Sequence, residues 1–208
     1  MRERYKTVKS EGTAEIIEKK SKFIAHVRRI ASEEEAMEFY ETIKKKYWDA
    51  RHNVYAYYIG GDSGIQKFSD EGEPSGTAGM PILQTIKNQG VEDVIVVVTR
   101  YFGGILLGTG GLVRAYSKSA GEGIKAAGIV EKIWSAKVHM RIDYNLLTRI
   151  QAISSNEGCC IIDTIYADLI DIYIAVPINK LEKLKKVILE LTGGGLQIDE
   201  IDRDYYIE

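Results

Sequence analysis

The chain contains few of the residues on which secreted, membrane-spanning and disulfide-stabilised proteins depend. Among its 208 residues there are two cysteines, three histidines and three prolines. The cysteines are adjacent, at Cys159 and Cys160, a spacing at which an ordinary intrachain disulfide is geometrically awkward. The N-terminal segment has no apolar stretch of signal-peptide length, and no run approaches the ~20 apolar residues of a membrane-spanning helix. We therefore expect a cytoplasmic protein that binds no membrane.

Signatures of common enzyme classes are also missing from the sequence. It has no G-x-S-x-G nucleophile elbow, no H-E-x-x-H helix and no C-x-x-C pair. His52 is the one plausible acid/base candidate, because it stands beside Arg51 at the start of an expected strand, whereas His139 alternates with apolar neighbours and is expected to pack in a sheet. We expect no catalytic residues, no metal and no cofactor, and hence a protein that is not an enzyme.

Charge of one sign does not dominate the chain. Its formal net charge is -2, with 28 Lys and Arg residues against 30 Asp and Glu residues. No overall field therefore attracts the protein to nucleic acid, and any such binding must come from a local group of basic residues.

Hydrophobic periodicity divides residues 1–133 into strands and helices. Ser32 and Glu35 form a capping box that opens a helix ending near Lys46. The other expected helices cover 78–89 and 108–128, and the expected strands cover 13–20, 22–30, 52–60, 65–69 and 94–100. These elements predict a sheet of mixed strands that carries helices on one side.

Residues 134–208 form a second domain in this interpretation. A long strand at 133–142 is followed by a helix, two strands, a helix and a strand, at 145–156, 160–167, 171–177, 180–191 and 196–206. The order βαββαβ predicts a ferredoxin-like domain, with four antiparallel strands and two helices on one face. The whole chain is therefore expected to be an α+β protein of two domains, at 1–133 and 134–208.

A glycine-rich loop between a strand and a helix, within residues 94–116, is the most informative segment. Gly103 and Gly108 have the spacing of P-loop glycines, but Thr109 occupies the position of the phosphate-binding lysine. Gly108 and Gly110 could open a dinucleotide fingerprint, but Val113 stands where its third glycine belongs. Neither motif is present.

What remains is a group of backbone N–H donors at a helix start, between two arginines, which is suited to phosphate oxygens. Equally, the glycines allow a tight turn and close packing, and this structural alternative stays open. Lys118 follows Arg114 by one helical turn, although a solvated helix face has the same appearance. The candidate phosphate- or nucleic-acid-binding residues are Arg100, Gly103, Gly104, Gly108, Gly110, Gly111, Arg114 and Lys118.

An acidic loop at 70–79 precedes the second helix. Its carboxylates could hold a hard cation or act as an acid/base pair. They also complement the dipole of the helix that follows, with Thr77 as a possible cap, and we favour this structural role. The candidate residues of this acidic motif are Asp70, Glu71, Glu73, Ser75 and Thr77.

The two loops together carry a resemblance to a known family. The segments DEGEPSGTAGMP at 70–81 and VVVTRYFGGILLGTGGLVRAY at 96–116 resemble the IMPACT family, in its bacterial YigZ type. The likeness extends over 21–27 and 50–60, and so covers nearly the whole first domain. Leu106 departs from the pattern, because many members have lysine at that position.

This resemblance implies a fold for each domain. The first would have the left-handed βαβ crossover of a small-subunit ribosomal protein and of domain IV of elongation factor G. The second would resemble the last domain of that factor. The family is tied to translation, and its eukaryotic members restrain a stress kinase by competing for a ribosome-bound activator.

We therefore expect a translation-associated regulatory protein that binds RNA or ribosome phosphates through the glycine-rich loop and the basic residues near it. One alternative is a regulator that binds a translation-factor protein or acts in a stress-kinase pathway. Another is an enzyme acting on a phosphorylated small molecule, with Asp70, Glu73 and His52 as its acid/base set.

Overall fold

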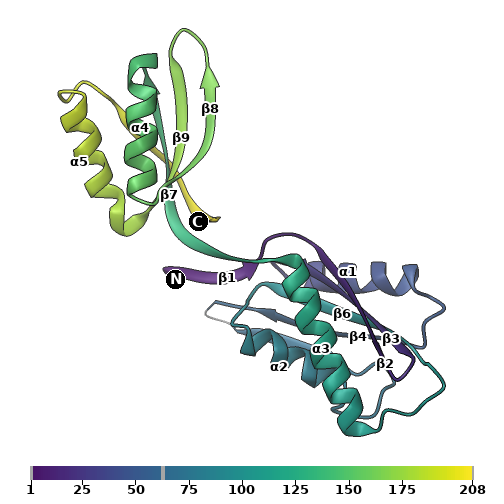
Figure 1. Cartoon of the computed structure of the whole chain (residues 1–208). Coiled ribbons are helices and arrows are strands. Elements are labelled where there is room, and N and C mark those ends of the chain that lie inside the picture. The colour runs from purple at the N-terminus through teal and green to yellow at the C-terminus, as the bar shows by residue number, and fades with distance from the viewer. Residues whose placement is uncertain (1, 62–63, 208) are drawn as a thin grey trace. The chain divides into compact units, whose positions relative to one another are not determined.

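The computed structural model describes residues 2–61 and 64–207 (Figure 1). It divides into two compact units, one of Tyr5–Val130 and one of Arg2–Arg4 with residues 131–207. None of the helices in the described residues is long and apolar enough to cross a membrane. Each unit has its own apolar core.

The first unit contains a five-stranded sheet in the order β2-β3-β6-β4-β5, in which all neighbouring strands are antiparallel. The expected mixture of parallel and antiparallel pairs is therefore wrong. In chain order its elements are β2 (Gly12–Glu18), β3 (Ser21–Arg29), α1 (Glu33–Lys46), β4 (His52–Ile59), β5 (Ile65–Ser69), α2 (Gly79–Asn88), β6 (Val94–Tyr101) and α3 (Thr109–Ala127). A short strand, β1 (Arg4–Val8), spans the division between the units and was not predicted.

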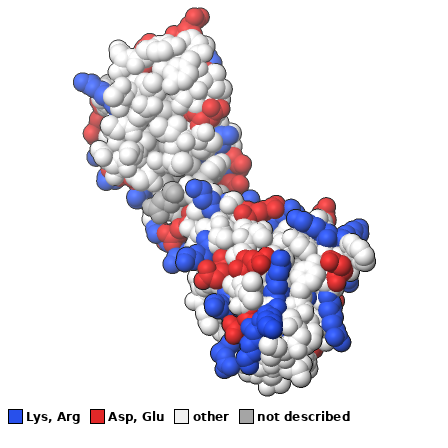
Figure 2. Space-filling model, turned by 45° about the vertical axis from the view of Figure 1, so that its right-hand side comes forward, with Lys and Arg blue, Asp and Glu red and all other residues white. Residues whose placement is uncertain are grey.

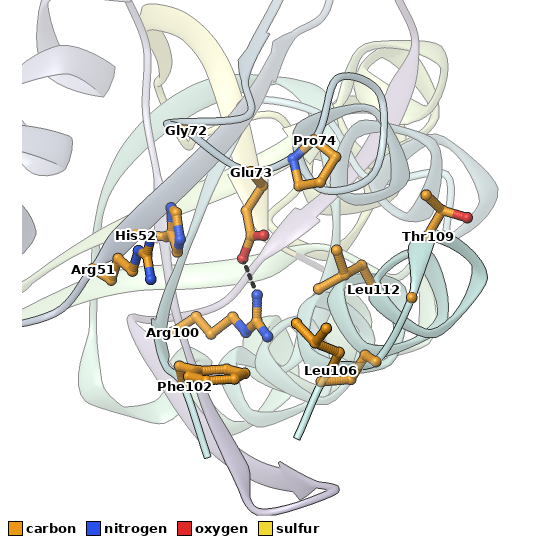
Figure 3. A pocket seen from close by; sticks show the side chains of 12 residues that line it. Arg51, His52, Gly72, Glu73, Pro74, Arg100, Phe102, Leu106, Thr109 and Leu112 are labelled. Carbon is orange, nitrogen blue, oxygen red and sulfur yellow. Dashed lines mark hydrogen bonds and ion pairs between the residues drawn. The ribbon is translucent and has the colours of Figure 1, made fainter. Parts of the chain in front are cut away.

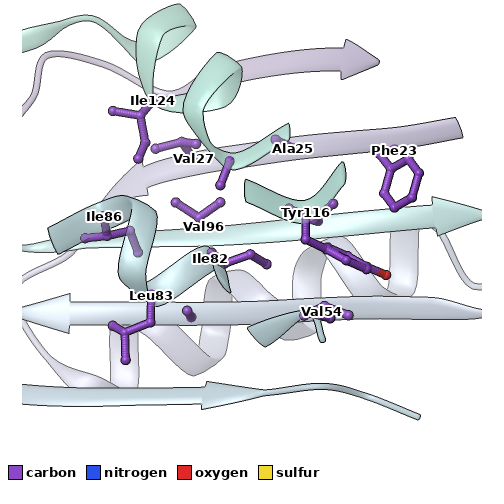
Figure 4. Packing of buried hydrophobic residues seen from close by; sticks show 14 of the residues in the cluster. Phe23, Ala25, Val27, Val54, Ile82, Leu83, Ile86, Val96, Tyr116 and Ile124 are labelled. Carbon is purple, nitrogen blue, oxygen red and sulfur yellow. The ribbon is translucent and has the colours of Figure 1, made fainter. Parts of the chain in front are cut away.

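Helices cover both faces of this sheet, whereas the sequence led us to expect them on one. Alternate residues of a strand point to opposite faces. Tyr55, Tyr57 and Val97 pack with α1 on one face. On the other, Val54 and Val96 pack with α2 and α3, as Figure 4 shows. The central strands are apolar on both sides for this reason.

The two helical connections within the sheet have opposite hands. α1 joins the parallel strands β3 and β4 across β6, and α2 joins β5 to β6 across β4. A rotation of the sheet by 180° in its own plane brings the two connections to the same strand direction and the same direction of crossover. They then differ only in the face of the sheet on which the helix lies. Because α1 and α2 lie on opposite faces, one connection is left-handed, as the family resemblance implies.

The second unit is the ferredoxin-like domain expected from the sequence. Its strands pair in the order β8-β9-β7-β10, all antiparallel. Even-numbered residues of β7 and β9 form a core with both helices, which therefore cover one face. The elements are β7 (Ile129–Ile142), α4 (Tyr144–Asn156), β8 (Cys160–Tyr166), β9 (Ile170–Pro177), α5 (Leu181–Leu191) and β10 (Ile198–Ile207), with a 3-10 turn at Ile178–Lys180.

Candidate functional site

The acidic loop and the glycine-rich loop meet around one cavity of the first unit (Figure 3). Its volume is about 420 Å³. The loop before α2, the start of β4, the end of β6 and the start of α3 all contribute to it. The lining residues are Arg51, His52, Gly72, Glu73, Pro74, Arg100, Phe102, Leu106, Leu107, Gly108, Thr109 and Leu112.

Glu73 links the two loops through a buried ion pair. Its Oε1 accepts a hydrogen bond from Arg100 Nη1 at 2.6 Å and another from the Tyr116 hydroxyl at 2.7 Å. Burial, and then the neighbouring Glu73 carboxylate, raise the pKa of Tyr116 far above its ordinary value, so the phenol stays protonated and donates. The acidic loop is thereby held to β6 and α3.

This geometry corrects the role expected for Arg100. Its exposed fraction is only 6%, and it is paired with a carboxylate that is exposed by 8%. Breaking a buried ion pair by removing one partner costs ~3–5 kcal/mol. Arg100 is therefore not presented to the backbone of an external nucleic acid, and we withdraw it from that expected interface.

Asp70 serves as an external cap for α2. Its carboxylate accepts hydrogen bonds from the backbone N–H groups of Gly76 at 2.8 Å, Ala78 at 3.0 Å and Gly79 at 2.8 Å. The favoured structural interpretation of the loop is thus correct for this residue, although Thr77 does not cap the helix as suggested. The Thr77 hydroxyl donates to the Pro74 carbonyl at 2.6 Å.

The remaining acidic-loop candidates do not assemble into a metal site. Glu71 Oε1 accepts from the Ser69 hydroxyl at 2.9 Å, and Ser75 is exposed. Among residues 2–61 and 64–207, no three Asp, Glu, His or Cys side chains are arranged to hold an ion. The loop is built around hydrogen bonds to its own backbone and to α2.

His52 lies at the edge of the cavity, on β4. Its Nδ1 donates to the Glu71 carbonyl oxygen at 2.9 Å, which fixes the ring against the acidic loop. The enzyme alternative needs Asp70 and Glu73 beside this histidine as free acid/base groups. Both carboxylates are occupied by the contacts above, so we do not carry that alternative into the proposed function.

The glycines of the second motif have different structural roles. Gly103 donates its N–H to Ser21 Oγ at 3.1 Å, and a Cβ there would lie 2.0 Å from the carbonyl carbon of Lys20. Gly104 and Gly108 have φ values of 82° and 73°, which other residues rarely adopt. Close packing and turn geometry therefore account for three of the five glycines.

The start of α3 retains free donors. Gly108 precedes the helix and provides no side-chain cap. In the described part of the chain, the N–H groups of Thr109, Gly110 and Gly111 have no hydrogen-bond partner, and the first intrahelical bond runs from Leu112 N–H to the Gly108 carbonyl at 2.9 Å. Such a terminus carries a partial positive charge.

Three exposed basic side chains follow along one face of α3. Arg114, Lys118 and Lys125 make no ion pair with any other described residue. At 100° per residue they fall within a sector of ~40°, and the first and last are ~16 Å apart along the helix axis. Figure 2 shows basic and acidic side chains interleaved on the face in view, without a large surface of one sign there.

Sequence reasoning missed several residues that line the cavity, and also Tyr116, which lies outside the lining and bonds to Glu73. Tyr116 lies within the second motif, but nothing in its spacing indicates a hydrogen bond to Glu73, 43 residues earlier. Phe102 belongs to the second motif and Leu106 departs from the family pattern, but neither is predicted to line a cavity. Leu107 is not singled out by the sequence, and Arg51 is identified only as a neighbour of His52. The alternation of apolar residues with glycines in this loop is the one sequence signal that could have indicated an apolar cavity wall.

Family models match both units. Residues 19–124 match the Impact N-terminal domain, and residues 140–194 match a domain of unknown function, DUF1949. The chain is 41% identical over 201 residues to the IMPACT family member YvyE of Bacillus subtilis (strain 168), covering 97% of this chain and 93% of that protein. It is 34% identical over 186 residues to the IMPACT family member YigZ of Escherichia coli (strain K12), covering 88% and 91%.

A solved structure agrees with these matches. It is described as the crystal structure of an hypothetical protein, is 32% identical in sequence and aligns with a TM-score of 0.62. The alignment covers 97% of this chain and 99% of that one.

Proposed function

This chain belongs to the IMPACT family, and from that premise we propose that it is a translation-associated regulatory protein whose first unit binds RNA phosphates along α3. Family membership supports the association with translation. The observation that supports RNA as the ligand is the exposed face of α3, where Arg114, Lys118 and Lys125 have no carboxylate partner among the described residues.

A shallow groove beside α3 strengthens this assignment. It has a volume of about 560 Å³ and is lined by Gln89, Lys118, Gly121, Glu122, Lys125 and Ile129. Gly121 has no side chain to prevent a backbone from approaching the helix. The two lysines of the groove offer cations to phosphate oxygens and the Gln89 amide provides a further donor, whereas the Glu122 carboxylate in the same lining repels phosphate.

The free N–H groups at the start of α3 extend the same surface. Thr109 and Gly110 lie about one turn before Arg114, and the Arg114 guanidinium is 3.8 Å from the position of a Cβ on Gly110. A phosphate at this end would receive backbone hydrogen bonds, the helix dipole and a cation together. Single-stranded RNA or an exposed strand of ribosomal RNA presents phosphates in this way.

Fluorescence anisotropy with a labelled single-stranded RNA tests the proposal. Arg114→Ala and Lys118→Ala are each expected to weaken binding about threefold to tenfold, because each removes one phosphate contact. Lys45→Ala is the matched control, since Lys45 is an exposed lysine of α1, on the other face of the sheet. Equal affinity of all three variants and the unaltered protein would contradict the proposal.

A protein-binding regulator is the second candidate. The glycine-rich loop exposes apolar side chains, with Phe102 exposed by 46%, Ile105 by 42% and Leu106 by 82%. Adjacent exposed apolar groups are characteristic of protein interaction surfaces. Ribosome co-sedimentation that survives high salt and is lost in Leu106→Ser, but not in Arg114→Ala, would favour this candidate over RNA binding.

A further inference from the structure

The cavity between the two motif loops shares the start of α3 with the basic face of that helix, but its side-chain polar groups, Arg51, His52 and Arg100, are its own. We propose that it is a binding site for a small organic acid, a monoanionic carboxylate carried on an apolar group. This goes beyond RNA binding, because the cavity is lined by neither Arg114 nor Lys118.

The walls of the cavity suit an apolar group. Figure 3 shows Leu106, Leu112 and Phe102 around one end, and Leu107 and Pro74 also line it. The volume of about 420 Å³ lies within the range of small-molecule sites, ~300–1,000 Å³. Phe102 and Leu106 are exposed by 46% and 82%, so a bound phenyl or alkyl group would cover apolar surface that otherwise meets water, whereas a phosphodiester backbone gains little from such walls.

The charges around the cavity favour a single negative charge. Glu73 and Arg100 form an ion pair and so largely cancel each other. Arg51 then adds a cation, and the uncapped start of α3 at Gly108 and Thr109 adds the positive end of a helix dipole. His52 adds no negative charge in either protonation state. With Glu73 neutralised by Arg100, Arg51 and the helix dipole balance about one negative charge, so the second charge of a dianion such as a phosphate monoester would have no partner.

Arg100 has donors left for a carboxylate. Its Nη1 is used by Glu73, whereas its Nη2 makes no hydrogen bond with any described residue. The Nε also has no partner, but it is fully buried, so a ligand in the cavity does not reach it. The side chain is more than nine-tenths buried and lines the cavity, with the guanidinium placed between Glu73 and Leu106 in Figure 3. The free Nη2 can donate to one carboxylate oxygen, and this hydrogen bond is strengthened by the charge on both groups.

Titration with 4-phenylbutyrate, followed by the amide chemical shifts of the cavity residues in the full chain, tests this inference. A dissociation constant of about 1 mM is expected for a ligand of about 12 non-hydrogen atoms. The neutral amide, 4-phenylbutyramide, should bind at least about tenfold more weakly, because it lacks the charge. Phenyl phosphate should also bind more weakly than the carboxylate.

Thr109→Glu provides a variant that keeps the fold. Thr109 is exposed in the first turn of α3, where a carboxylate favours the helix but repels a bound acid. It should weaken 4-phenylbutyrate binding about tenfold relative to the neutral variant Thr109→Gln. Arg51→Ala at the edge should weaken it about threefold to tenfold, whereas Arg114→Ala should leave it unchanged.

Several results would overturn the inference. One is an absence of chemical-shift changes at cavity residues when the 4-phenylbutyrate concentration is about 10-fold above the expected dissociation constant. Another is equal affinity for the acid and the amide, or a higher affinity for phenyl phosphate. A third is equal affinity of Thr109→Glu and Thr109→Gln for the acid. RNA binding is measured separately through Arg114→Ala. If the cavity does not bind the acid, the proposed binding of RNA along α3 is therefore neither supported nor contradicted.

Discussion

The Glu73 side chain holds the acidic loop and the glycine-rich motif in fixed positions relative to each other. Its carboxylate receives a guanidinium from β6 and a phenol from α3, although the sequence separations are 27 and 43 residues. Both donors are as buried as the acceptor. The acidic residue is thus the acceptor around which Arg100 and Tyr116 are arranged.

Replacing Glu73 with Gln should destabilise the first unit by ~3 kcal/mol or more, because Arg100 would keep its charge without a buried partner. Tyr116→Phe should cost ~1–2 kcal/mol, since it removes one hydrogen bond to a charged acceptor. Urea unfolding followed at amide resonances of the first unit measures both. Ser75→Ala, in the exposed part of the same loop, is the control. A cost for Glu73→Gln no larger than that of Ser75→Ala would disprove this account.

His26 makes the stability of the first unit depend on pH. Burial, and secondarily the charge of Lys46, lower the pKa of His26 from 6.5 to about 4. Between those values the unfolded chain binds a proton that the folded chain does not, so stability decreases as pH falls from 6.5 towards 4. Its side chain is 4% exposed, and we expect a loss on the order of 2 kcal/mol over this range.

Urea unfolding of the first unit at a series of pH values measures this loss, and His26→Gln removes the titrating group. The difference in pH dependence between the two proteins isolates the histidine from the carboxylates. Identical profiles would show that His26 is protonated as easily in the fold as in the unfolded chain.

The connection from β6 to α3 illustrates which glycines are demanded by the fold. Gly103 faces the backbone of Lys20 at 2.0 Å from a hypothetical Cβ, whereas Gly110 would meet only the flexible end of Arg114 at 3.8 Å. Both belong to one motif in the sequence. Only the distances separate a position that needs glycine from one that does not.

Gly103→Ala should therefore destabilise the first unit by ~3 kcal/mol or more, because backbone must move to admit the methyl group. Gly110→Ala, in the first turn of α3, should stabilise it by ~0.5–1 kcal/mol through the higher helix propensity of alanine. Thermal unfolding of the two variants measures the contrast. Similar costs for both would contradict this assignment.

Local signals in the sequence predicted the elements well and the site poorly, for physical reasons. Ser32 accepts from the Glu35 N–H at 3.3 Å, as the capping box predicts, and β5 occupies the expected residues 65–69. These are short-range effects. The burial of Arg100 depends on Glu73, and Asp70 caps α2 from 8 or 9 residues away, so neither follows from periodicity.

Helices on both faces of the first sheet could also have been anticipated. The run of apolar residues at 94–98 is buried on both sides, which an uncovered sheet face would not allow. The expectation of one covered face ignored this pattern. The amphipathic helix at 33–46 is the element that covers the other side.

For the molecule as a whole, the formal net charge does not describe the charge that a ligand meets at a local surface. The formal net charge is -2, yet three cations of α3 have no carboxylate partner among the described residues. Long-range attraction to RNA should therefore be weak, while contact-range binding remains sensitive to salt.

A plot of log affinity for single-stranded RNA against log salt concentration should have a slope of about -2, from ~0.7 for each of three phosphate contacts. Arg114→Ala should reduce the magnitude of the slope by ~0.7. Anisotropy titrations across a salt series measure both values. A slope near zero would mean that phosphates are not what the protein contacts.

The hairpin between β2 and β3 reaches the glycine-rich loop directly. Lys19 and Lys20, at its tip, have φ values of 44° and 66°, and Gly103 lies against the Lys20 backbone and the Ser21 hydroxyl. Because the tip is exposed and in direct contact with Gly103, the rate of proteolytic cutting there would report on the packing of a loop more than 80 residues downstream, without any ligand.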